Sequence, residues 1–271
     1  MLAPGHPGVE EVITIILDCC APGIEYLRMA LRAYAGGAVF AESSGPAPRV
    51  LALHGWGRRS SDFRSALGGL SYLAPDLPGF GASPPPAEAL GSREYAAILA
   101  PLLEELGERP VLVGHSFGGR VALHLVSMHP DRFTGLVLTG APLFRLTPPG
   151  KPALLFRVSR WAARLGLISE ARMERIRQRH GSWDYRAATG VMRETLVRIL
   201  NESYENELAA LDLPVLLLWG AEDHEASVAI AERLAELIAG AELQILDGVG
   251  HAVPLEAPLA LRDAVEKMLT P

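Results

Sequence analysis

Short apolar runs alternate with longer amphipathic segments along most of this chain. Runs of four to eight apolar residues are typical of buried strands, and apolar residues recurring every three or four positions are typical of helices. Their alternation predicts an α/β fold with a mostly parallel sheet and helices on both faces. The strands are expected at 49–55, 70–76, 110–116, 135–141, 214–220 and 242–248, with intervening helices at 92–106, 117–129 and 227–240 among others.

Three regions depart from this alternation. Residues 30–45 read as two antiparallel edge strands around Gly36-Gly37. Residues 142–203 contain no strand-like run and read as three or four amphipathic helices inserted between two strands. Residues 1–28 precede the pattern and are expected to be an N-terminal extension, with translation from Met29 as a second hypothesis.

The composition fits a globular protein of 271 residues. Hydrophobic residues make up 49% and charged residues 21% of the chain, which argues against disorder. The net charge of −6 gives no overall attraction to nucleic acid, and no apolar run reaches the length of about 18 residues that a transmembrane helix needs. Cys19 and Cys20 are adjacent and are the only cysteines, so we expect no disulfide framework and a cytoplasmic location.

The clearest chemical motif is Gly114-His115-Ser116-Phe117-Gly118, a G-x-S-x-G sequence between a predicted strand and a predicted helix. A sharp strand-to-helix turn needs small residues two positions before and after the serine, and it exposes the hydroxyl at the helix N-terminus. Ser116 is therefore the candidate nucleophile. A structural turn is the alternative interpretation.

A serine hydroxyl needs a base, and the base needs an acid that orients it. His251 lies in a glycine-containing loop after the last predicted strand, and Asp223 follows the strand before it. Both positions belong to the carboxyl edge of a parallel sheet, where Ser116 also stands. Glu222 is the competing acid. His54 and His115 are expected to shape turns by hydrogen bonding.

Acyl transfer also needs donors aimed at the developing oxyanion. The sequence His54-Gly55-Trp56-Gly57 ends the first parallel strand, and its glycines let the backbone approach Ser116. We expect the backbone N–H groups of Trp56 and Phe117 to be these donors. Trp56, Phe117, Leu143 and Phe144 are further expected to line the substrate site. No nucleotide-binding or metal-ligand spacing occurs, so no cofactor is expected.

Five motifs in order, HGWG, DLPGFGAS, GHSFGG, WGAED and GVGHAVPLE, resemble the α/β-hydrolase superfamily over about residues 30–271. The chain order serine, aspartate, histidine is the order of that superfamily. The resemblance implies a core formed by 29–141 and 204–271 and a helical cap at 142–203. One departure is that no proline follows Asp223 within a few residues, as it often does in relatives.

The resemblance implies a serine hydrolase acting on carboxylic esters through a Ser-His-Asp triad. Ser116 argues against the dehalogenases and epoxide hydrolases of this fold, which use an aspartate nucleophile. Cofactor-free perhydrolases or haloperoxidases, C–C bond hydrolases and pimeloyl-carrier-protein methyl ester esterases remain alternatives, as does a binding protein without catalysis. The substrate is expected to be a small ester, and the oligomeric state stays open.

The charge is unevenly distributed. Residues 142–203 carry 12 basic and 5 acidic side chains, a formal charge of +7, whereas the rest of the chain has 13 basic and 26 acidic side chains, or −13. A solvated helix face is the simpler explanation. The sharper hypothesis is that this segment attracts an anionic substrate or an acidic carrier protein.

Overall fold

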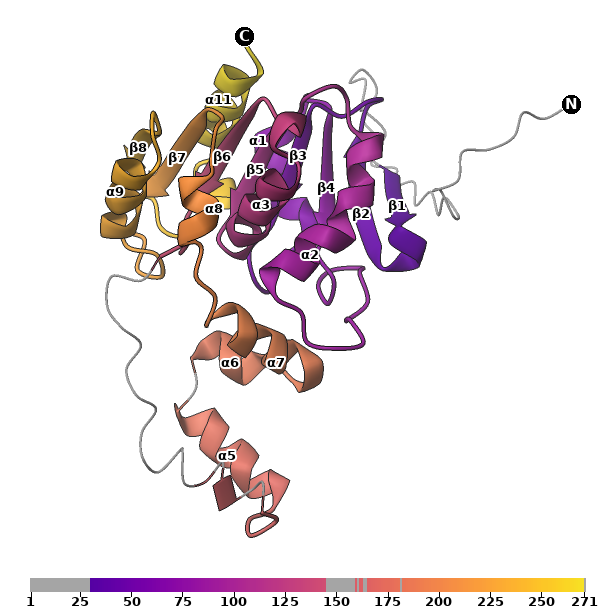
Figure 1. Ribbon diagram of the computed structural model, residues 1–271, viewed down its shortest axis with the longest axis vertical. Coiled ribbons are helices and arrows are strands. Elements are labelled where there is room, and N and C mark those ends of the chain that lie inside the picture. Colours follow the sequence, from indigo (N-terminus) through magenta and orange to yellow (C-terminus); the bar gives the residue numbers. More distant parts are fainter. Residues whose placement is uncertain (1–29, 145–158, 160, 163–164, 181, 271) are drawn as a thin grey trace, which may run out of the picture.

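The computed structural model describes residues 30–144, 159, 161–162, 165–180 and 182–270. Its centre is one eight-stranded sheet in the order β1-β2-β4-β3-β5-β6-β7-β8 (Figure 1). The strands are β1 (Ala30–Tyr34), β2 (Val39–Ser44), β3 (Val50–Leu53), β4 (Tyr72–Asp76), β5 (Val111–His115), β6 (Gly135–Thr139), β7 (Val215–Gly220) and β8 (Glu242–Leu246). The N-terminal extension expected at 1–28, with both cysteines, lies outside the described residues.

The sheet is mostly parallel, as the sequence predicts. β1 pairs antiparallel with β2, and β2 pairs antiparallel with β4, while all other neighbours are parallel. The two antiparallel strands expected within 30–45 are confirmed, but only β1 is an edge strand, because β2 lies between β1 and β4. A short 3₁₀ turn, Ala35–Gly37, joins the two strands. Gly36 has a φ of 65°, a left-handed conformation that glycine adopts without strain.

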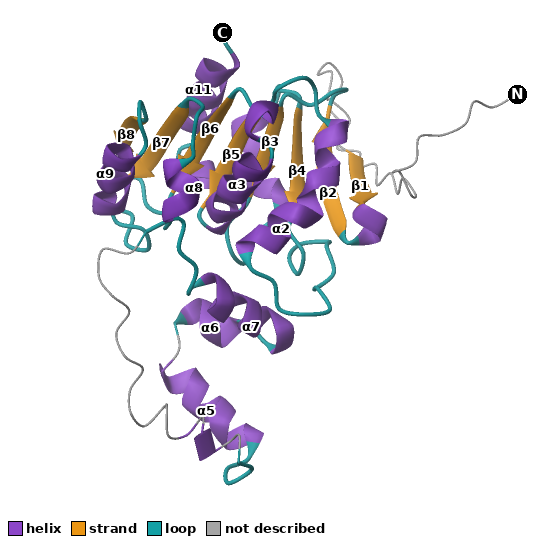
Figure 2. Ribbon diagram, in the orientation of Figure 1, coloured by secondary structure: helices purple, strands orange, loops and turns teal. Residues whose placement is uncertain are grey.

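Helices cover both faces of the sheet (Figure 2). The α-helices are α1 (Arg64–Leu67), α2 (Ser92–Leu99), α3 (Phe117–Met128), α5 (Glu170–His180), α6 (Trp183–Ala187), α7 (Gly190–Ile199), α8 (Glu205–Ala209), α9 (Val228–Leu237), α10 (Val253–Glu256) and α11 (Pro258–Leu269). Further 3₁₀ turns are Ser60–Phe63, Ala100–Glu105 and Pro130–Arg132.

The helix predicted at 92–106 is wrong in its second half. The α-helix ends at Leu99 and continues as the 3₁₀ turn Ala100–Glu105. Pro101 explains the change, because its ring removes a backbone N–H and clashes with the preceding turn of an α-helix.

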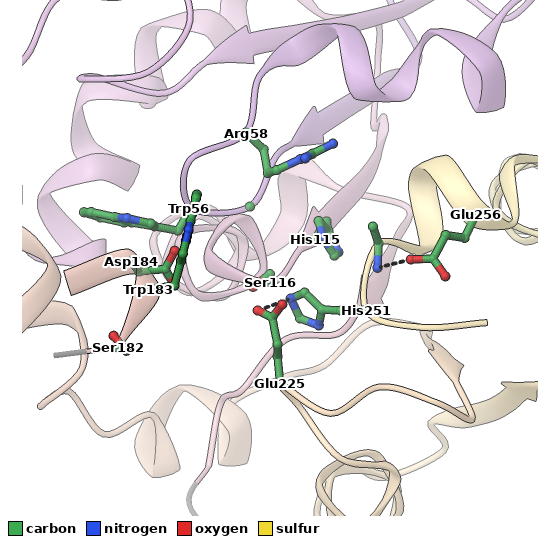
Figure 3. Close-up of a pocket in the computed structure, with 12 residues that line it drawn as sticks. Trp56, Arg58, His115, Ser116, Ser182, Trp183, Asp184, Glu225, His251 and Glu256 are labelled. Atoms are coloured by element: carbon green, nitrogen blue, oxygen red, sulfur yellow. Dashed lines mark hydrogen bonds and ion pairs between the residues drawn. The ribbon is translucent and has the colours of Figure 1, made fainter. Parts of the chain in front are cut away.

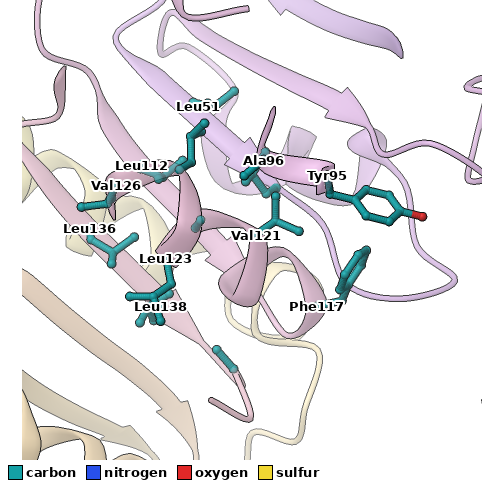
Figure 4. Close-up of a cluster of buried hydrophobic side chains, with 14 of the residues drawn as sticks. Leu51, Tyr95, Ala96, Leu112, Phe117, Val121, Leu123, Val126, Leu136 and Leu138 are labelled. Carbon is teal, nitrogen blue, oxygen red and sulfur yellow. The ribbon is translucent and has the colours of Figure 1, made fainter. Parts of the chain in front are cut away.

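Alternate residues of each central strand face two separate hydrophobic clusters. Leu51, Leu112 and Leu138 pack with α2 and α3 on one face (Figure 4), whereas Val50 and Val137 belong to the cluster on the α1 and α11 face. This period of two follows from the pleat of a strand. Because both faces are covered, the central strands are buried along their whole length and read as continuous apolar runs.

The inserted segment between β6 and β7 contributes α5, α6 and α7, which lie beyond one end of the sheet (Figure 1). Within the described residues of 142–203, all regular structure is helical. The carboxyl ends of β3, β5, β6, β7 and β8 share one edge of the sheet because these strands are parallel. The loops that follow them are thereby brought together at this edge.

We expect Leu138→Ala to lower the free energy of unfolding by about 2 to 5 kcal/mol, because it opens a cavity under α3 where the side chain is fully buried. Urea unfolding followed by circular dichroism measures this change. Leu259→Ala is the matched control: Leu259 is 71% exposed, so its loss should change the value by less than about 0.5 kcal/mol. Equal unfolding midpoints for the two variants would contradict the packing described here.

Candidate active site

Ser116 occupies a strained turn between β5 and α3. Its backbone has a φ of 51° and a ψ of −113°, a combination that residues with a side chain rarely adopt. Two hydrogen bonds hold it: the Ser116 N–H donates to the Thr139 carbonyl oxygen at 2.8 Å, and the Gly119 N–H donates to the Ser116 carbonyl oxygen at 3.0 Å. The turn places Ser116 at the N-terminus of α3.

The glycines of the motif are required by close backbone packing. A Cβ atom on Gly118 would lie 2.1 Å from the Leu53 carbonyl oxygen, and one on Gly114 would lie 2.6 Å from Cα of Gly119. Both distances are far below van der Waals contact and involve backbone that cannot move aside easily. The spacing recognised in the sequence therefore has a steric cause in this fold.

Asp223 and His251 form a hydrogen-bonded pair. His251 Nδ1 lies 2.8 Å from Asp223 Oδ2, and Asp223 Oδ1 accepts hydrogen bonds from the N–H groups of Glu225 at 2.9 Å and Ala226 at 2.7 Å. Asp223 is buried, so its carboxylate is fixed by these three contacts. Glu222, the competing acid, is exposed on the same loop.

Glu256 holds the backbone on both sides of His251. Its Oε2 accepts a hydrogen bond from the Gly250 N–H at 2.7 Å, and its Oε1 accepts one from the Ala252 N–H at 3.0 Å. This role of Glu256 is not predicted by any motif in the sequence. The only signal available was an acidic residue five positions after the histidine, at the end of the short helix α10.

The environment of His251 acts on its pKa in two directions. Burial lowers the pKa, but the hydrogen bond and charge of Asp223, together with the charges of Glu225 and Glu256, outweigh burial and raise it above the ordinary value of 6.5. Glu225 Oε2 lies 3.5 Å from His251 Nε2. The imidazolium form of His251 is thus stabilised by several carboxylates.

Ser116 and His251 line the same cavity, which has a volume of about 660 Å³ (Figure 3). Loops after β3, β5, β7 and β8 contribute to it, as does α6 with the residue before it. Its lining consists of Gly55, Trp56, Arg58, His115, Ser116, Ser182, Trp183, Asp184, Glu225, His251, Ala252 and Glu256.

Of the four residues expected to bind substrate, Trp56 alone is among the lining residues. The Phe117 ring packs edge-on against Trp56 and Tyr95, with centroid separations of 5.5 and 5.0 Å. Leu143 is buried in the hydrophobic core, and Phe144 packs against that core. Sequence reasoning missed Trp183 and Asp184, which reach the cavity from the inserted segment.

The loop after β3 is held by a neutral histidine. The Leu77 N–H donates to His54 Nε2 at 2.9 Å, so Nε2 carries no proton, and Nδ1 donates to the Gly55 carbonyl oxygen at 2.7 Å. Burial lowers the pKa of His54 to about 4, which keeps this arrangement at neutral pH. Hydrogen bonding by His54 is therefore confirmed, and it fixes Trp56 beside Ser116.

His115 and Asp76 also shape turns. Burial and the nearby His251 lower the pKa of His115 to about 3, and its Nδ1 lies 2.9 Å from Thr139 Oγ1. Asp76 accepts hydrogen bonds from the N–H groups of Ser60 at 2.7 Å and Ala82 at 2.8 Å. Asp76 thereby ties two loops together below the cavity.

The backbone N–H groups expected to hold the oxyanion are those of Trp56 and Phe117. Phe117 is the first residue of α3, so its N–H has no carbonyl partner within the helix. Trp56 follows Gly55, and a Cβ on Gly55 would lie 3.3 Å from Cβ of Ser116, which shows how closely the two turns approach. The arrangement offers two donors from two strand ends.

Among the described residues, no group of three or more histidine, cysteine, aspartate or glutamate side chains is arranged to hold a metal ion. None of the helices described is both long and apolar enough to pass through a bilayer.

Comparisons with known proteins agree with this fold. The chain is 31% identical over 240 residues to a pimeloyl-[acyl-carrier protein] methyl ester esterase of Aromatoleum aromaticum, covering 78% of this chain and 94% of that protein. It is 28% identical to the biotin biosynthesis bifunctional protein BioHC of Cellvibrio japonicus, covering 81% of this chain but only 47% of that longer protein. The chain therefore spans about half the length of this bifunctional relative.

Solved structures share the same architecture. The crystal structure of a bromoperoxidase from Bacillus anthracis superimposes with a TM-score of 0.69 at 20% sequence identity, covering 90% of this chain and all of that one. The model of the alpha/beta hydrolase family matches residues 50–264, which include Ser116, Asp223 and His251. The chain belongs to the alpha/beta hydrolase family.

Proposed function

We propose that this protein is a serine hydrolase that cleaves carboxylic esters. The observation that carries the proposal is that His251, hydrogen-bonded to the buried Asp223, lines the same cavity as Ser116, which stands on a strained turn at a helix N-terminus. A strained, exposed serine beside a histidine that a buried aspartate orients is the arrangement that nucleophilic catalysis needs.

In the proposed reaction, Ser116 Oγ attacks the acyl carbon and its proton passes to His251 Nε2. Asp223 keeps the Nδ1 proton in place and stabilises the imidazolium, while the N–H groups of Trp56 and Phe117 hold the oxyanion. His251 then protonates the leaving alcohol, and an acyl-enzyme remains. Water, deprotonated by His251, releases the acid and restores Ser116.

We further propose that residues 142–203 act as a cap over a core formed by 29–141 and 204–271. Ser182, Trp183 and Asp184 support this, because they line the cavity opposite the loops that carry the catalytic candidates. A cap of this kind would exclude water and restrict which esters reach Ser116.

A carrier-linked methyl ester is a more specific candidate substrate. The pimeloyl-[acyl-carrier protein] methyl ester esterase with 31% identity favours it, as does the +7 charge of residues 142–203. Among the described basic residues of this segment, Arg172, Arg175 and Arg186 are exposed. Exposed guanidinium groups would attract an acidic carrier protein without entering the cavity.

Ser116→Ala should reduce kcat/KM for short p-nitrophenyl esters at least about a thousandfold, because it removes the nucleophile. A fluorophosphonate probe should label the wild-type protein on the peptide that contains Ser116, as read by mass spectrometry. Ser227→Ala is the matched control, since Ser227 is exposed and its side chain makes no capping hydrogen bond at α9. A folded Ser116→Ala variant with undiminished turnover would refute the mechanism, and absence of labelling would favour a binding protein.

The acid limb of the kcat/KM profile should lie above pH 6.5, because His251 must be neutral to accept the Ser116 proton and its pKa is raised. Activity is then lost as the pH falls through this pKa. Glu225→Gln removes a carboxylate 3.5 Å from Nε2 and should move the limb to lower pH, whereas Glu222→Gln should leave it in place. A Glu225→Gln limb at unchanged or higher pH would contradict the described environment.

If the basic segment attracts an acidic carrier, KM for a carrier-linked methyl ester should rise steeply with salt, while KM for a small neutral ester stays constant. Steady-state kinetics between 20 and 500 mM NaCl measure both (concentrations chosen to span a Debye length of roughly 20 to 4 Å). The same salt response for both substrates would remove the carrier hypothesis and leave ester hydrolysis intact.

A further inference from the structure

The charged lining of the cavity is acidic, in contrast to the basic segment that lies beside it. Four lining residues are charged at neutral pH: Arg58, Asp184, Glu225 and Glu256. Arg58 Nε donates to Asp62 Oδ2 at 2.6 Å, which neutralises its guanidinium locally. Glu256 is occupied by the backbone N–H groups beside His251. Asp184 and Glu225 are the other two, so three of the four charged lining residues are acidic.

These two carboxylates come from different parts of the chain (Figure 3). Glu225 belongs to the loop after β7, and its Oε2 lies 3.5 Å from His251 Nε2, the atom that exchanges protons with the substrate. Asp184 belongs to α6 of the inserted segment and is half-buried. Burial and the charge of Glu225 raise the pKa of Asp184, so the two carboxylates repel each other.

The described arginines of the inserted segment do not relieve this repulsion. Arg193 pairs with Glu174 through two hydrogen bonds of 2.6 and 2.8 Å, and Arg198 pairs with Glu94. Arg172, Arg175 and Arg186 are exposed and are not lining residues. The positive charge of this segment therefore lies outside the cavity as far as its residues are described.

Two indole rings share the cavity with the carboxylates. Trp56 and Trp183 are both lining residues, and Figure 3 shows them beside Asp184. The face of an indole ring attracts a cation through its quadrupole, most strongly where water is partly excluded. Carboxylates and indole faces in one cavity attract the same kind of group.

We propose that this cavity selects esters that carry a positively charged group near the ester bond, and that Asp184 and Glu225 determine this specificity. The proposal rests on the proposed ester hydrolysis and names its substrate class. A cationic group would relieve the repulsion between the two carboxylates, whereas an anionic group would increase it. A carrier-linked ester is compatible with this cavity if the end that reaches Ser116 is uncharged.

The expected size of the preference for a cationic ester depends on how exposed the two carboxylates are. The Glu225 side chain is 71% exposed, so solvent screens its charge strongly. A partly exposed carboxylate next to a cation favours binding by roughly two- to fivefold, which gives roughly four- to twenty-fivefold for the pair if the two act independently. This preference is large enough to measure with matched substrates.

The test compares esters that differ only in charge. In one series the acyl group of a p-nitrophenyl ester is 4-(trimethylammonio)butanoate, its carbon isostere 5,5-dimethylhexanoate, or the anionic adipate monoester. In a second series the alcohol of a butyrate ester is choline or its carbon isostere 3,3-dimethylbutanol. The measured quantity is the ratio of kcat/KM for the cationic ester to that for its neutral isostere.

We expect a ratio above about four in at least one series for the wild-type protein. Asp184→Asn and Glu225→Gln should each lower that ratio, and the double variant should bring it near one and raise turnover of the adipate monoester. Intrinsic ester reactivity cancels because each ester is compared across variants. Glu222→Gln is the matched control, since it removes an exposed carboxylate from the same loop without altering the cavity lining.

Labelling gives a readout that needs no turnover. The rate at which Ser116 reacts with a fluorophosphonate bearing a trimethylammonio group should exceed the rate for the carbon isostere, and the double variant should abolish the difference. Ratios near one in both series and in labelling, or ratios that the double variant leaves unchanged, would overturn the proposal. If those ratios are found and hydrolysis of neutral esters still depends on Ser116, the proposed preference for cationic esters is wrong but the proposed hydrolysis is not. If Ser116→Ala retains activity, the proposed function itself is wrong.

Discussion

The left-handed backbone of Ser116 is the constraint on which the rest of this site depends. A φ of 51° at a residue with a side chain costs free energy, of the order of 1 to 3 kcal/mol, that the surrounding fold must supply. Here β5 and α3 supply it, since α3 is buried through nearly its whole length against the sheet and cannot rotate to relax the turn. The serine is exposed to the cavity because the core on either side of it is rigid.

The same close packing limits what can surround Ser116. Gly118 lies directly against the carbonyl oxygen of Leu53, so β3 and the start of α3 are nearly in contact. That contact brings the loop after β3, with its Trp56 N–H, beside the first N–H of α3. Neutral His54 then prevents the loop from moving, because both of its ring nitrogens are engaged by backbone groups. Steric fit at one glycine thus brings together the two strand ends that carry the proposed oxyanion donors.

Features that depend on residues close together in the sequence could be predicted, whereas features that depend on distant residues could not. The apolar runs predicted the central strands correctly because burial on both faces leaves no polar position to obscure them. Pro101 disfavours an α-helix, but the helix predicted at 92–106 followed the apolar periodicity instead. In the structure a 3₁₀ turn contains Pro101. Asp223 rather than Glu222 contacts His251, a distinction that spacing alone left open because the two are neighbours in the chain.

The cavity lining was harder to predict because it is assembled from distant segments. Leu143 and Phe144 were expected there as apolar residues of the inserted segment, but Leu143 is buried in the core and Phe144 packs against it. Asp184 and Trp183 carry no motif, and they reach the cavity only because α6 folds back over the carboxyl edge of the sheet. Glu256 accepts hydrogen bonds from backbone N–H groups, which nearly every residue has. Its role could therefore not be recognised in the sequence, apart from its spacing from His251.

The charges of the inserted segment and the charges of the cavity lining act on a substrate or partner in different ways. The +7 of residues 142–203 is a formal sum along the sequence, and a charge that is exposed to solvent, as those of Arg172, Arg175 and Arg186 are, acts on approaching partners within about a Debye length. Asp184 and Glu225 line the cavity, so under the proposed specificity these two carboxylates would act on a bound substrate at shorter range than the exposed arginines. A basic exterior and an acidic cavity are therefore compatible. In the proposed reaction the acidic cavity would favour a cationic group near the ester bond and repel the carboxylate that hydrolysis produces.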